Sequence, residues 1–177
     1  ANLFVSEKEN VLLEYKVEKH KYNMLIARLE PENNIETILD GVVKSDTVLP
    51  FLVIGKHETK FGEFLKNKFS NDNRIKFLGG IYNIEHLDNL RFYSNLYFHG
   101  HSVGGTNPSL LEAMASSSFI IAHDNDFNKS ILGKDAFYFL NSDDVKLQLT
   151  KSKANYSEVV QANLNKIENE FSWPIIN

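Results

Sequence analysis

The segment Gly104-Gly105-Thr106-Asn107-Pro108-Ser109 combines residue types that are suited to binding a phosphate group. Asn107 is a good N-cap residue and Pro108 suits the first position of a helix, so the spacing predicts a helix that begins at Pro108. The free amides of Ser109 and Leu110 would then point out of the helix end, with the positive end of the helix dipole behind them. The two glycines allow backbone to approach a ligand closely. The segment therefore predicts a site for a phosphate or diphosphate, the alternative being a capped helix that binds nothing.

Glu112 lies about one turn further into this predicted helix, on the same side as Pro108. Its neighbours are small and apolar, and Leu110 with Met114 has the i,i+4 spacing of a face that packs on a core. A carboxylate in such a helix can accept hydrogen bonds from the hydroxyl groups of a sugar. The alternative interpretation is a solvated helix residue, which is the ordinary place of a glutamate.

Composition excludes several classes of protein. The chain has 177 residues, enough for one domain with a sizeable core, and a formal net charge of −4 without a long basic run, which argues against a nucleic-acid partner. It has no cysteine, which excludes disulfides and thiolate metal sites, and no apolar run that would span a membrane. We expect a single domain over residues 1–177, excised from a longer two-domain cytoplasmic enzyme that contacts the inner face of the membrane at most peripherally, with residues 1–20 as a linker or edge strand.

Short apolar runs alternate with amphipathic segments along the chain. The runs predict strands at residues 22–27, 51–54, 74–78, 96–99, 119–122 and 136–140. The amphipathic segments predict helices at residues 31–43, 58–69, 85–94, 108–115, 127–132, 143–150 and 156–171. This alternation with short connections predicts an α/β fold, a Rossmann-like open parallel sheet with helices on both faces.

Polar and glycine residues follow the ends of the predicted strands. They are Arg28, His57, residues 79–82 and residues 100–109. In an open parallel sheet the ligand lies beyond the carboxyl ends of the strands, near the point where the strand order reverses. These residues should therefore converge on one site.

Four segments in a fixed order carry a family resemblance: ARLEPENNIETIL (27–39), LVIGK (52–56), RIKFLGGI (74–81) and LLEAMA (110–115). Together they resemble the C-terminal, donor-binding half of GT-B glycosyltransferases, specifically the retaining glycosyltransferase family 4, over roughly residues 20–173. The segment HGHSVGGTNPSLLEAM (99–114) is similar to a narrower subset of this family, which includes bacterial rhamnosyltransferase-like enzymes of capsule and O-antigen assembly.

The resemblance implies roles for individual residues. It implies that Arg28 contacts the donor diphosphate and that Glu112 holds the nucleotide ribose, and we take these two as the catalytic pair. It places the phosphate-binding helix start on residues 107–110. It places the loop around the nucleobase on Gly80, Ile81 and Tyr82, where backbone groups read the base and the tyrosine ring packs on it.

Two positions depart from the family pattern. The family's lysine, five residues after the arginine, is replaced by Asn33, whose amide can donate hydrogen bonds to phosphate without cancelling its charge. The first of the family's paired glutamates falls on Gly104, which has no side chain. Recognition of the donor sugar would then depend on other groups near the glycine-rich loop, namely His101, Ser102, Gly105, Thr106 and Asn107. The loss of the carboxylate fits a deoxy-sugar donor.

Histidines and aspartates elsewhere favour simpler roles. His99 and His101 lack the nearby carboxylate or cysteine expected of a metal site, and the resemblance implies a reaction without metal or other cofactor. His57 and His123 suit capping or packing. Asp124 and Asp126 suit a turn and an N-cap.

The resemblance implies transfer of a sugar, with retained anomeric configuration, from a nucleoside-diphosphate donor to a lipid-linked bacterial surface polysaccharide. The acceptor would be bound by an N-terminal domain. Two other classes stay open: a GT-B sugar-nucleotide epimerase, which needs carboxylates around the sugar, and a non-catalytic nucleotide-sugar-binding module. A dinucleotide dehydrogenase is disfavoured, because no G-x-G-x-x-G follows the first strand.

Overall fold

The computed structural model describes residues 5–103 and 108–170 of the chain. Within them, six parallel strands form one sheet in the order β3-β2-β1-β4-β5-β6. The strands are β1 (Asn23–Ile26), β2 (Phe51–Ile54), β3 (Ile75–Gly79), β4 (Tyr97–His99), β5 (Ile120–His123) and β6 (Phe137–Phe139). The order reverses between β1 and β4. The predicted Rossmann-like open parallel sheet is confirmed.

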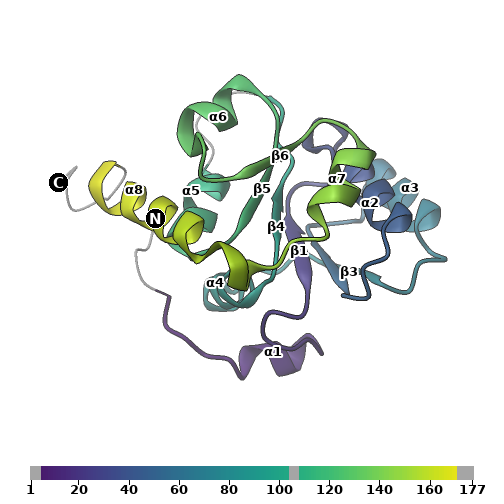
Figure 1. Cartoon of the computed structure of the whole chain (residues 1–177). Coiled ribbons are helices and arrows are strands. Elements are labelled where there is room, and N and C mark those ends of the chain that lie inside the picture. Colours follow the sequence, from purple (N-terminus) through teal and green to yellow (C-terminus); the bar gives the residue numbers. More distant parts are fainter. Residues whose placement is uncertain (1–4, 104–107, 171–177) are drawn as a thin grey trace.

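Helices cover both faces of the sheet (Figure 1). The helices α2 (Ile35–Lys44), α3 (Lys60–Lys68) and α7 (Ser142–Gln148) pack on one face. The helices α4 (Ile84–Tyr93), α5 (Pro108–Ala115) and α6 (Asp126–Leu132) pack on the other, and α8 (Ser157–Glu170) contributes to both cores. Neighbouring strand residues point to opposite faces, so Leu25 belongs to the first core and Met24 to the second. The strands β1, β2, β4 and β5 are therefore buried on two sides, as their continuous apolar runs predict, whereas Lys76 of the edge strand β3 is exposed.

The structure differs from the sequence prediction at three places. Residues 11–14 form the short helix α1 (Val11–Glu14), which packs on α4 and is no edge strand of the sheet. The predicted helix at residues 31–43 is divided into a 3₁₀ turn, Pro31–Asn33, and α2, because Asn34 between them has a left-handed backbone with φ of 55°. The N-cap of α6 is Asn125, whose side chain accepts a hydrogen bond from the amide of Asn128, and neither neighbouring aspartate takes that role.

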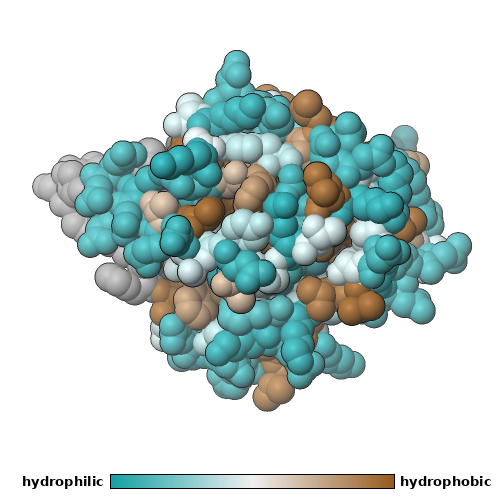
Figure 2. Space-filling view, in the orientation of Figure 1, coloured by the Kyte–Doolittle hydropathy of each residue, from teal (hydrophilic) through white to brown (hydrophobic). Residues whose placement is uncertain are grey.

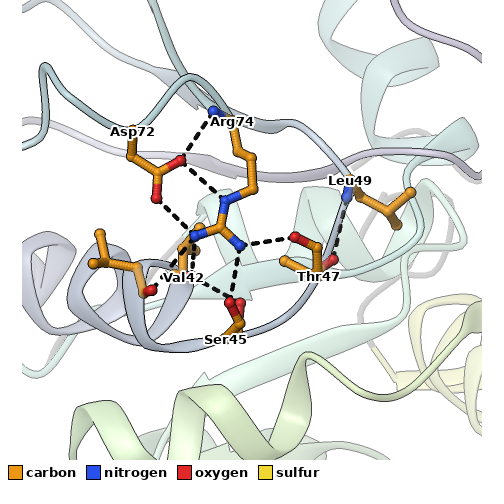
Figure 3. A network of polar contacts seen from close by, with 7 residues as sticks. Val42, Ser45, Thr47, Leu49, Asp72 and Arg74 are labelled. Carbon is orange, nitrogen blue, oxygen red and sulfur yellow. Dashed lines mark hydrogen bonds and ion pairs between the residues drawn. The ribbon is translucent and has the colours of Figure 1, made fainter.

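Arg74 fixes the end of α2 to the sheet (Figure 3). Its guanidinium donates hydrogen bonds to the carbonyl oxygens of Val42, Ser45 and Thr47 at 2.7–3.0 Å. Its Nε and Nη2 atoms also donate to the two carboxylate oxygens of Asp72, at 3.0 and 2.7 Å. Carbonyl groups at a helix end lack partners within the helix, so the arginine satisfies them and anchors the connection from α2 to β2.

Hydrophilic residues cover most of the face shown in Figure 2, and hydrophobic residues appear there in small separate groups. The described segments include no helix with the length and apolar character needed to cross a membrane.

Candidate functional site

The loops that follow β1, β2, β3 and β4 meet the first turn of α5 around one cavity of about 530 Å³. It lies at the carboxyl edge of the sheet, where the strand order reverses, as expected of a ligand site in such sheets. The residues that line it are Ile26, Ala27, Arg28, Leu29, Glu30, Ile54, Gly55, Lys56, Thr59, Gly80, Ile81, Tyr82, His101 and Ser109. The convergence expected from the sequence is thus seen for residues of four loops and of α5.

Backbone contacts hold three of these loops together. The amide of Ala27 donates to the carbonyl of Ile54 at 3.0 Å, and the amide of Gly55 donates to the carbonyl of Gly79 at 2.9 Å. A Cβ atom on Gly55 would lie 2.0 Å from the Ala27 carbonyl oxygen, so only glycine fits there. The ends of β1, β2 and β3 therefore form a fixed floor under the cavity.

The loop after β4 is tied to the turn before α2. Asn34 Nδ2 donates to the carbonyl of Gly100 at 2.7 Å, and Ser102 donates to the carbonyl of Glu32 through both its amide and its hydroxyl. A Cβ atom on Gly100 would lie 2.1 Å from the Asn33 carbonyl oxygen. These contacts place the loop of Arg28 beside the loop of His101, across the point where the strand order reverses.

Arg28 and Ser109 line the same cavity, which is the arrangement predicted for a diphosphate site. Arg28 is exposed, and no hydrogen bond or salt bridge joins its guanidinium to another described residue. Glu30 also lines the cavity; its pKa is raised because it shares a hydrogen bond with the carboxyl group of Glu32. Helix α5 begins at Pro108, as predicted. Among the described residues, the cavity therefore combines an arginine that has no salt-bridge partner with the first turn of a helix.

Asn33 has a different place from the one predicted. Its side chain is 6% exposed, and Nδ2 donates to the carbonyl of Arg28 at 2.8 Å. It does not line the cavity. In this structure the amide holds the backbone of the Arg28 loop and is not directed at a ligand.

Glu112 lies on α5, with its side chain 48% exposed, and its carboxylate accepts a hydrogen bond from Arg91 Nη2 at 3.0 Å. Arg91 is 3% exposed and also contacts Asp88, at 3.3 Å. Glu112 is not among the residues that line the cavity, and neither is Leu110, which is fully buried. The position of the glutamate is thus fixed by a buried arginine that sequence reasoning missed.

His101 lines the cavity with its ring stacked on His99, the ring centroids being 4.5 Å apart. Burial lowers the pKa of His101, and burial together with the neighbouring His101 ring lowers the pKa of His99 to about 3. Nδ1 of His101 is buried without a hydrogen-bond partner among the described residues. The cavity thus has a neutral imidazole in its wall at neutral pH.

Gly80, Ile81 and Tyr82 line the side of the cavity nearest β3. The Tyr82 side chain is 82% exposed, and a Cβ atom on Gly80 would lie 2.5 Å from the Tyr82 hydroxyl oxygen. Glycine at this position therefore lets the ring lie over the loop. A flat apolar ring beside exposed backbone is suited to a nucleobase.

Gly105, Thr106 and Asn107, with Gly104, lie outside the described residues. Ser102 is described and exposed but does not line the cavity. Sequence reasoning missed Lys56, Thr59 and Glu30 as cavity residues. The signal for Lys56 was available, because it follows β2 as Arg28 follows β1.

The family model described as "Glycosyl transferases group 1" matches residues 11–150. A comparison with curated proteins gives no match.

Several solved structures share the fold. Anabaena Alr3699/HepE, in complex with UDP and glucose, has a TM-score of 0.84 at 15% identity, over 99% of this chain and 52% of that one. A glycosyltransferase from Rickettsia africae has a TM-score of 0.81 at 14% identity, over 95% and 48%. The C-terminal domain of the group 1 glycosyl transferase LpcC from Francisella tularensis has a TM-score of 0.77 at 18% identity, over 98% and 99%. The chain spans about half the length of the first two, and it has the fold of the C-terminal half of GT-B glycosyltransferases.

Proposed function

The chain belongs to the group 1 glycosyl transferases, and from this premise we propose that its cavity binds a nucleoside-diphosphate sugar as the donor for glycosyl transfer. We place the chain in the retaining family 4. The transferred sugar is a deoxyhexose such as rhamnose, and the acceptor is a lipid-linked bacterial surface polysaccharide, capsule or O-antigen. The reaction takes place in the cytoplasm at the inner face of the membrane.

One observation carries the proposal: Arg28 and Ser109, which are far apart in the sequence, line one cavity together with Gly80, Ile81 and Tyr82. The cations and amides that a diphosphate needs therefore lie next to the loop suited to a base. The volume of about 530 Å³ is within the usual range for small-molecule sites. HepE, which has the same fold, has been crystallised with UDP-glucose.

The chemical task is to stabilise the diphosphate as it leaves. Negative charge grows on the diphosphate when the glycosidic bond breaks, and groups that already point at it lower the barrier. The Arg28 guanidinium supplies a planar fork of donors, and the first turn of α5 supplies oriented amides. The reaction requires no metal in this proposal, because these groups take the developing charge.

The other parts of the donor fall on the two sides of the diphosphate. The base lies against Tyr82 and the backbone of the loop after β3. The ribose extends beyond the residues that line the cavity, and its hydroxyls donate to Glu112, which Arg91 holds in place. The sugar lies toward His101, whose neutral ring can accept or donate one hydrogen bond to a hydroxyl group. An N-terminal domain supplies the acceptor hydroxyl.

A thermal-shift panel tests the proposal. We expect UDP, dTDP or GDP to raise the melting temperature of the chain, by about 5–10 °C at a ligand concentration near 100 times Kd. Arg28→Met should weaken the binding of that nucleotide about 10- to 100-fold, because it removes a charge-assisted hydrogen-bond donor. Glu112→Gln should weaken it less and should affect nucleosides as well, since the contact is to ribose.

The matched control is Arg74→Met, which removes an arginine that contacts Asp72 and the connection after α2 and does not line the cavity. It should lower the melting temperature without changing the nucleotide-induced shift. If no nucleoside diphosphate shifts the wild-type chain, the proposed function is wrong.

A further inference from the structure

A nucleotide sugar presents about two negative charges on its diphosphate at neutral pH, and Arg28 supplies one positive charge toward it. The family pattern has a lysine where this chain has Asn33, and the structure shows what the asparagine does in its place. It is 6% exposed and donates to the Arg28 carbonyl. No charge compensation comes from that position.

Lys56 lines the same cavity as Arg28. It is exposed, and no hydrogen bond or salt bridge joins its ammonium group to any described residue. It directly follows Gly55, whose amide donates a hydrogen bond to the Gly79 carbonyl. A Cβ atom at Gly55 would lie 2.0 Å from the Ala27 carbonyl oxygen, so no side chain fits there. The backbone that carries Lys56 is therefore held beside the backbone that carries Arg28.

The strand order gives Lys56 its place relative to the parts of the donor. Along the carboxyl edge, β3 carries Gly80 to Tyr82, β2 carries Lys56, and β1 carries Arg28. Lys56 thus lies between the loop suited to a base and the arginine suited to the diphosphate.

We propose that Lys56 is the second cation of the diphosphate site and takes over the charge that Asn33 does not supply. This inference rests on the proposed function, because it assigns Lys56 to the diphosphate of the same donor. A lysine on a flexible stem binds phosphate as a point charge, whereas Arg28 binds it as a fork of donors. Lys56 therefore strengthens the binding of the charged diphosphate but does little to fix its orientation.

The test measures binding by calorimetry at low salt with two kinds of probe. The charged probes are UDP, dTDP and GDP, and the uncharged probes are uridine, thymidine and guanosine. Lys56→Met should weaken the binding of the preferred nucleoside diphosphate about 5- to 20-fold and leave that of its nucleoside unchanged. Lys56→Arg should retain affinity within about 3-fold, and the loss in Lys56→Met should shrink in high salt, because screening weakens the contact.

The matched control is Lys60→Met, which removes the same charge from an exposed lysine four residues away that does not line the cavity. It should change affinity less than about 2-fold, because an exposed lysine outside the cavity makes no direct contact with the diphosphate and its charge acts through water. If Lys56→Met and Lys60→Met lose the same affinity for the nucleoside diphosphate, Lys56 acts only through the overall positive charge of the protein, and the inference is overturned. An unchanged affinity in Lys56→Met, with binding lost in Arg28→Met, would overturn it too while leaving the proposed function standing. If the wild-type chain binds none of the charged probes, both fall.

Discussion

Burial determines the protonation state of His99, and this has a measurable consequence for stability. The folded protein holds the pKa of this imidazole near 3, chiefly because burial removes water from the charged form. The unfolded chain has the ordinary value of about 6.5. Between these values the unfolded state binds more protons, so the free energy of unfolding falls as the pH falls below about 6.5.

We therefore expect His99→Leu to lose less stability than the wild type on acidification. The difference in the free energy of unfolding between the two proteins should change by up to about 1.4 kcal/mol for each pH unit from about pH 6 to pH 4. Urea denaturation at several pH values measures it. Parallel stability curves over this range would show that His99 has no such shift.

At the residue scale, the sequence predicted which residues lie at the cavity better than it predicted which side chains bond to one another. Arg28, Tyr82, His101 and Ser109 line the cavity because they follow strand ends or begin a helix, and sequence alone reveals that. The internal bond of Asn33 and the pairing of Glu112 with Arg91 depend on elements that meet only in the folded chain. No spacing in the sequence indicates which polar side chain turns toward a neighbouring loop.

At the scale of elements, one arginine determines how α2 ends. The Arg74 guanidinium donates hydrogen bonds to four carbonyl groups and to both carboxylate oxygens of Asp72. The hydrogen bonds from Arg74 hold the pKa of Asp72 below its ordinary value. The network is mostly withdrawn from water, with Arg74 at 24% and Asp72 at 16% side-chain exposure. A network of this kind loses much when one member is removed.

Arg74→Met should lower the free energy of unfolding by about 2–4 kcal/mol, because it leaves Asp72 and the end of α2 without their donors. Lys68→Met is the comparison. Lys68 also pairs with α2, through Glu36 and Asp40, but at an exposed position, so its loss should change stability by less than about 1 kcal/mol. Chemical denaturation measures the free energy of unfolding of both variants. Similar losses in the two would show that Arg74 does not have the stabilising role assigned to it.

The sequence predicted the ends of helices and strands well where those ends coincide with the ends of an apolar pattern. Strand β2 coincides with the predicted run, and the other strands differ from theirs by one residue at one or both ends. The break at Asn34 was missed, because a left-handed residue inside a helical pattern leaves no periodic signal and asparagine tolerates that conformation. Helix α1 was missed because four residues are too few to establish a period.

At the scale of the whole molecule, the crossover rules account for the site. Alternating strands and helices with right-handed connections lead to a parallel sheet whose order reverses once, and the reversal between β1 and β4 opens the edge where the cavity lies. The fold and the location of the cavity were therefore predictable. Its lining was predictable only in part, because the internal contacts of the loops decide which side chains face inward.

The last prediction concerns the 177-residue chain as a catalyst. The groups described around the cavity suit a donor, since Arg28, Ser109 and Tyr82 can contact a nucleoside diphosphate. Transfer also needs an acceptor hydroxyl held against the anomeric carbon, and effective alignment of two reactants contributes several orders of magnitude to a rate. In the function proposed above, an N-terminal domain holds this hydroxyl. We therefore expect the chain to bind its nucleoside diphosphate and to transfer no sugar.

A transfer assay checks this expectation with radiolabelled UDP-glucose, dTDP-rhamnose and GDP-mannose as donors and a lipid-linked saccharide as acceptor. Turnover above that of Arg28→Met would show that the chain completes the active site by itself.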